Sequence, residues 1–97
     1  MNTHERTYLD GLLKKMEADG LGFRVVYERW DEDTKHNITA KDAMKALGQC
    51  DEEWINVYRG EDCIGQMFLV YDNCQDGAEV VCDYHVSLDP WIDPEEK

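Results

Sequence analysis

Four cysteines and three histidines are the side chains in this sequence best suited to metal binding or nucleophilic chemistry. Cys50, Cys63, Cys74, Cys82 and His85 all carry donor atoms that zinc accepts. No two of the cysteines have the C-x-x-C spacing that structural zinc sites usually show. The strand alternation described below also turns Cys82 into the core. We therefore expect reduced core and turn cysteines, and no metal ion.

A nucleophilic site would need a thiol beside a base. Cys82 and His85 are close in sequence, but no acid or oxyanion motif accompanies them; His4 lies near the start and His36 in a polar loop. The segments ADGLG and GEDCIG lack the spacing and the lysine of a phosphate-binding loop. The sequence therefore predicts neither an enzyme nor a cofactor-binding protein.

Carboxylates are the dominant reactive groups, and they are unevenly distributed. The net charge is −12; residues 1–48 carry nine acids and eight bases, whereas residues 49–97 carry 13 acids and two bases. A surface of this sign repels nucleic acid and anionic membranes and attracts basic protein surfaces. The alternative is that the charge serves solubility alone. Because acids are so frequent, no pair of them marks a catalytic site.

Two helices are indicated by periodicity and by capping residues. The first has one apolar stripe at period 3.6, made of Tyr8, Leu9, Leu12, Leu13 and Met16. Thr3 can cap its first turn, and Gly20 ends it. In the second helix Thr39 and Asp42 have capping-box spacing, and Gly48 follows the last turn.

The expected elements are a helix at 3–19, a strand at 23–30, a helix at 39–47, strands at 54–59, 63–71 and 78–84, and a tail at 85–97. We expect one α+β domain over residues 1–97, with order α-β-α-β-β-β and a short C-terminal turn. Its antiparallel sheet has about four strands, with both helices on one face; where strand 23–30 joins is left open. Leu88, Trp91 and Ile92 would pack the tail partly onto the body.

No apolar run is long enough for a bilayer and no signal peptide is evident, so the expected location is the cytoplasm.

The turns GED and DNCQDG fix an expected register for the last three strands. The predicted pairs are Ile55–Met67, Val57–Gly65, Leu69–Val80, Met67–Cys82 and Gly65–Tyr84, with GED as a three-residue loop between Arg59 and Cys63. Gly65 would then leave room for the Tyr84 ring. One face collects Ile55, Val57, Gly65, Met67, Leu69, Val80, Cys82 and Tyr84, and we expect it under the helices. The other face collects Trp54, Asn56, Tyr58, Ile64, Gln66, Phe68, Val70, Glu79, Val81 and Asp83.

This second face mixes aromatic and acidic side chains, which is typical of an interaction surface. Either it is free, or the tail folds back and covers Trp54 and Phe68 with Trp91. The candidate partner-binding residues are its aromatic side chains and the acids on and around it: Asp51, Glu52, Glu53, Trp54, Tyr58, Glu61, Asp62, Phe68, Asp72, Asp76, Glu79 and Asp83.

The pattern Trp54–Ile55…Gly65…Phe68–Leu69–Val70…Val80–Val81–Cys82–Asp83–Tyr84 is similar to the C-terminal half of uncharacterised phage proteins. The chain resembles small acidic proteins encoded by phages and other mobile elements and, in size, charge and cytosolic character, anti-CRISPR proteins. This resemblance implies an inhibitor that occupies a basic, nucleic-acid-binding surface of a host complex in the host cytoplasm, without itself binding nucleic acid or membrane. The alternative is a homo-oligomeric scaffold, such as a homodimer, that pairs through the aromatic face.

Overall fold

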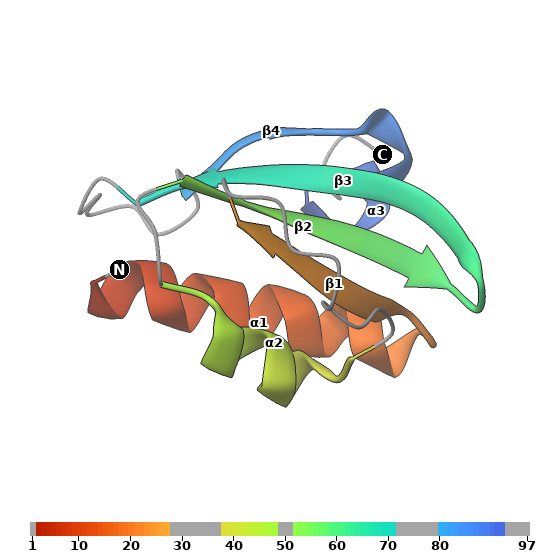
Figure 1. The fold of residues 1–97 in the computed structure, drawn as a ribbon, viewed down its shortest axis with the longest axis horizontal. Coiled ribbons are helices and arrows are strands. Elements are labelled where there is room, and N and C mark those ends of the chain that lie inside the picture. Colours follow the sequence, from red (N-terminus) through yellow and green to blue (C-terminus); the bar gives the residue numbers. More distant parts are fainter. Residues whose placement is uncertain (1, 28–37, 49–51, 72–79, 93–97) are drawn as a thin grey trace.

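The described residues form a four-stranded antiparallel sheet with helices on one face (Figure 1). The computed structural model describes residues 2–27, 38–48, 52–71 and 80–92. Its elements are α1 (Thr3–Ala18), β1 (Gly22–Tyr27), α2 (Ala40–Ala46), β2 (Glu52–Arg59), β3 (Asp62–Val70), β4 (Val81–Tyr84), the 3-10 turn η2 (Val86–Leu88) and α3 (Asp89–Ile92). The predicted α+β class is confirmed. Among the described helices none is long and apolar enough to cross a membrane.

Both main helices begin at side-chain caps. Asn2, rather than the predicted Thr3, caps α1: its side chain accepts a hydrogen bond from Glu5 N (2.8 Å), and Glu5 Oε1 accepts one from Asn2 N (2.9 Å). This is a complete capping box, which satisfies two backbone donors that the helix leaves unpaired. At α2 the predicted cap residue is confirmed, because Thr39 Oγ1 accepts from Asp42 N at 3.1 Å, which is the Thr39 half of the predicted capping box.

The register of β2 and β3 is the predicted one over most of its length. Ile55 lies opposite Met67 and Val57 opposite Gly65, and β1 occupies the sheet edge beside β2. The turn differs from prediction. Arg59 pairs with Asp62, so the connection has two residues rather than three, and a bulge between this turn and Gly65 absorbs the difference.

The register of β3 and β4 differs from prediction by one residue at Leu69 and, beyond a bulge, by two residues at Met67. Met67 lies opposite Tyr84 rather than Cys82, and Leu69 lies opposite Val81. Cys82 is the extra residue between these pairs, and a bulge changes which face the residues beyond it occupy. The predicted inward orientation of Cys82 is therefore wrong: its side chain is exposed. Val81, expected on the other face, packs against the core instead.

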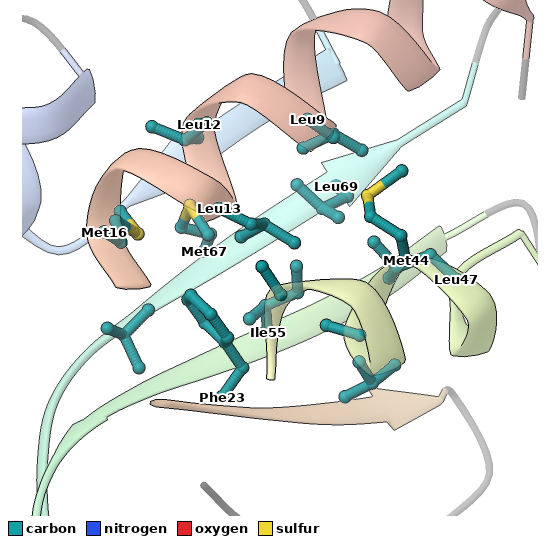
Figure 2. Close-up of a cluster of buried hydrophobic side chains, with 14 of the residues drawn as sticks. Leu9, Leu12, Leu13, Met16, Phe23, Met44, Leu47, Ile55, Met67 and Leu69 are labelled. Atoms are coloured by element: carbon teal, nitrogen blue, oxygen red, sulfur yellow. The ribbon is translucent and has the colours of Figure 1, made fainter. Parts of the chain in front are cut away.

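The hydrophobic core lies between the helices and one face of the sheet (Figure 2). Its fully buried side chains include Leu9, Leu13 and Met16 from α1, and Phe23, Ile55, Met67 and Leu69 from the strands. Each such burial stabilises the fold by about 1.5–3 kcal/mol. Within the described parts of the chain this face of the sheet is therefore filled by the hydrophobic core.

The segment 85–92 packs on the helix side of the sheet. Trp91 Nε1 donates a hydrogen bond to Asp19 Oδ2 at 2.7 Å, at the end of α1. Trp91 and Ile92 also lie against the surface of α1. Trp91 therefore does not cover Trp54 and Phe68, and the alternative in which the tail covers this pair with Trp91 is wrong.

Gly65 is the point at which η2 approaches the sheet. A Cβ atom at this position would lie 2.8 Å from Ser87 Oγ and 2.9 Å from Leu88 Cγ. The Ser87 hydroxyl donates to the Ile64 carbonyl, and Leu88 is fully buried. The sequence had predicted that the Tyr84 ring fills the space beside Gly65. That prediction is wrong, because η2 fills this space.

Gly65→Ala is expected to destabilise the protein by about 1–3 kcal/mol, because the added methyl group overpacks the contact with η2. Urea unfolding followed by circular dichroism measures the change. Gly11→Ala is the matched control: Gly11 lies inside α1, and its added Cβ would meet nothing within 4 Å outside the neighbouring backbone of that helix. The same change should therefore stabilise the protein by up to about 1 kcal/mol. Equal effects of the two changes would contradict the close packing at Gly65.

Candidate protein-binding face

The sheet face opposite the helices carries side chains from all four strands. Strand alternation places on it Arg24 and Val26 from β1, Glu52, Trp54, Asn56 and Tyr58 from β2, Gln66, Phe68 and Val70 from β3, and Asp83 from β4. We call five of these residues, all predicted from the sequence, the acidic–aromatic face: Glu52, Trp54, Tyr58, Phe68 and Asp83.

An aromatic pair lies at the centre of the acidic–aromatic face. Trp54 and Phe68 are direct cross-strand neighbours, and their ring centroids are 5.0 Å apart with planes tilted by 30°. Both side chains are half-buried. Cross-strand aromatic contact restricts the two rings, so each presents a firm apolar surface at little entropic cost.

Exposed carboxylates flank the aromatic pair. Glu52 lies at the start of β2, and Asp83 lies on β4 directly opposite Phe68. The described cation on this face is Arg24, which is half-buried beside Asn56; its Nε has no hydrogen-bond partner among the described residues. Within the described ranges the face therefore has two carboxylates against one guanidinium.

The β2–β3 turn carries two further predicted acids, Glu61 and Asp62, and both are exposed. They lie at the far end of the hairpin from Glu52, roughly 23 Å away at the rise of an extended strand. Four other candidates fall outside the described residues: Asp51, Asp72, Asp76 and Glu79.

Glu53 does not belong to the acidic–aromatic face. It is fully buried on the helix side of β2, where its Oε1 accepts hydrogen bonds from Gly48 N (2.8 Å) and from the Tyr71 hydroxyl (2.6 Å). Burial, together with the hydrogen bond to this carboxylate, raises the pKa of Tyr71 far above its ordinary value. The phenol therefore remains a donor, and Glu53 is a structural acid that no partner can reach.

The thiols and imidazoles form no metal-binding group in the described parts of the chain. Cys63 and Cys82 are exposed free thiols, and Cys50 and Cys74 lie outside the described ranges. Within those ranges no three histidine, cysteine or acidic side chains form a group that could hold a metal ion. His85 caps η2, its Nδ1 accepting from the backbone N–H of Ser87 at 3.1 Å.

A hollow of about 560 Å³ opens on the outer face between β3 and β4. Its lining includes Asn56, Gln66, Phe68, Asp83 and His85. Phe68 and Asp83 were predicted as binding residues, whereas the two amides and the histidine were not. The confirmed β2–β3 register implies that Asn56 lies opposite Gln66, so the signal for the amide pair was present in the sequence.

In comparisons with known proteins, no protein-family model, curated protein or solved structure matches the chain.

Proposed function

We propose that the acidic–aromatic face docks on a basic, nucleic-acid-binding surface of a host protein complex and inhibits that complex by occupying it. The observation that carries this proposal is the Trp54–Phe68 pair between exposed carboxylates. It lies on a sheet face that α1, α2 and the segment 85–92 leave uncovered. A defence complex guided by nucleic acid is the kind of target that the resemblance to anti-CRISPR proteins implies.

The charged and aromatic groups have different tasks in this proposal. Carboxylates attract a surface built to hold phosphates, which accelerates association and makes it sensitive to salt. Desolvated aromatic anchors at the centre of an interface supply most of the affinity. With a net charge of −12 the chain repels nucleic acid itself. Because the chain and nucleic acid are both attracted to the same basic protein surface, they compete for it.

Reversing two acids of the acidic–aromatic face should abolish binding. The immobilised chain is used to capture proteins from a nuclease-treated host lysate, and each captured complex is tested for loss of nucleic-acid binding on adding the free chain. Glu52→Lys combined with Asp83→Lys is expected to prevent both capture and competition. Raising the salt from about 0.05 to 0.5 M should slow association of the unaltered chain at least about tenfold, because the Debye length shrinks.

The matched control is Asp10→Lys with Asp42→Lys on α1 and α2, which changes the net charge equally, from −12 to −8 at +2 for each reversal. It should retain capture and competition. Equal loss in both double variants would reduce the effect to overall charge and contradict a specific face. If light scattering instead showed a dimer that Trp54→Ala dissociates, and no host protein were captured, the homo-oligomeric scaffold would replace this proposal.

A further inference from the structure

We infer that the hollow between β3 and β4 is a receptor for a single arginine side chain of the basic partner. This inference rests on the proposed function, since it names the partner group that one part of the acidic–aromatic face recognises. The hollow offers a guanidinium an aromatic ring, a carboxylate and a pair of fixed amides, from Phe68, Asp83, Asn56 and Gln66.

The ring and the carboxylate border the same space because Phe68 and Asp83 are direct cross-strand neighbours. Such neighbours have Cβ atoms about 4.5–5.5 Å apart, which is within the span of one guanidinium. A cation within about 6 Å of a ring centroid is attracted by its face. The Phe68 ring also contacts Trp54 on β2, the strand on the other side of β3, with 5.0 Å between the ring centroids. This contact holds the Phe68 ring in place.

The carboxylate of Asp83 is oriented before any ligand arrives. Its Oδ1 accepts a hydrogen bond from the backbone N–H of Tyr84 at 2.8 Å. The bulge at Cys82 changes the orientation of the next residue in β4, so that the Asp83 side chain lies on the outer face, opposite Phe68. The lone pairs of Oδ2 remain as acceptors for the N–H groups of a guanidinium.

The amide pair favours arginine over lysine. Gln66 Nε2 donates to Asn56 Oδ1 at 2.7 Å, which fixes both amides and leaves the Gln66 carbonyl oxygen as an acceptor. A guanidinium presents five donors in one plane, and it can stack on a ring while it bonds to two oxygens at its edge. An ammonium group is a compact, strongly hydrated charge that cannot do both.

The test uses three peptides, acetyl-Gly-Xaa-Gly-amide with arginine, lysine or citrulline as Xaa, in ¹H–¹⁵N NMR titrations of the full chain. The arginine peptide should give saturable shifts centred on Gln66, Phe68 and Asp83. The lysine peptide is expected to bind at least about fivefold more weakly, and the uncharged citrulline peptide at least about tenfold more weakly, because only arginine combines charge with a planar fork.

Variants separate the hollow from general charge. Asp83→Asn and Phe68→Leu should each weaken the arginine peptide at least about fivefold, whereas Asp42→Asn, the same charge change on α2, should leave its affinity within about twofold. The dispersion of each spectrum shows that the variant is folded. Equal affinity for the arginine and lysine peptides, or equal weakening by Asp83→Asn and Asp42→Asn, would overturn the inference.

The two proposals can fail separately. If the chain captures a basic partner but the arginine peptide does not perturb the hollow, the arginine receptor is wrong and the proposed function stands. If the peptide binds as expected but no nucleic-acid-binding complex is captured, the receptor stands and the proposed function is wrong.

Discussion

Glu53→Lys is expected to unfold the protein, whereas Glu52→Lys, the same change one position earlier, should leave it folded. The side chain of Glu53 is fully buried and accepts hydrogen bonds from Gly48 N and the Tyr71 hydroxyl. A lysine there would place a buried cation against two donors. Such a charge without a partner costs several kcal/mol, which is comparable with the roughly 5–15 kcal/mol that stabilises a whole domain. Far-UV circular dichroism and urea unfolding measure both variants.

The neighbouring position and an isosteric variant are the controls. Glu52 is exposed, so its replacement by lysine should change the free energy of unfolding by no more than about 0.5 kcal/mol. Glu53→Gln keeps the shape of the side chain and one acceptor oxygen. It should lower the free energy of unfolding by about 1.5–3 kcal/mol, because it replaces hydrogen bonds to a charged acceptor by weaker ones to a neutral acceptor. A Glu53→Lys variant as stable as Glu52→Lys would show that this carboxylate is not buried.

Local signals were sufficient to predict the element order and much of the sheet. The capping pair Thr39–Asp42 and the alternation of β2 lie within a few residues of the structure they determine. The predicted pairs around Ile55 and Met67 are correct although the β2–β3 turn has two residues rather than three, because the bulge before Gly65 compensates for the shorter turn. Glu53 was predicted as a partner-binding residue because of its charge, and that prediction is wrong; its burial could have been inferred from the same alternation, because Glu53 shares the strand parity of Ile55 and a period of two places both on one face.

The parts that were not predictable depend on contacts distant in sequence. A bulge adds one unpaired residue to a strand, and nothing local in β4 distinguishes Cys82 pointing inward from Cys82 pointing outward. The tail reaches the helix side because Gly65 gives Ser87 and Leu88 space and Asp19 accepts a hydrogen bond from the indole of Trp91. That second contact joins residues at opposite ends of the chain.

These two nonlocal features also determine the candidate site. The position of the tail leaves the Trp54–Phe68 pair uncovered by residues 85–92. The bulge directs Asp83 to the outer face beside Phe68. The sequence therefore predicted which residue types form the acidic–aromatic face, whereas the hollow between β3 and β4 required the observed register.

Trp54→Ala is expected to lower the affinity for the captured basic partner at least about 30-fold. This corresponds to the roughly 2 kcal/mol lost when a central aromatic anchor is truncated. The fold should survive, because the half-buried indole contributes mainly its contact with Phe68, worth about 0.5–1.5 kcal/mol beyond its buried area. Calorimetric titration of the partner with each variant measures the affinity.

Trp91→Ala is the matched control, because Trp91 is also half-buried but lies on the helix side, with its indole N–H on Asp19. Its loss should leave the affinity within about twofold, yet it should lower the free energy of unfolding by about 1 kcal/mol or more, since a hydrogen bond and packing against α1 are both removed. The two tryptophans thus separate the readouts: one change acts on binding, and the other acts on stability. If both variants lost affinity in proportion to their loss of stability, binding would depend on the integrity of the fold and not on an anchor at Trp54.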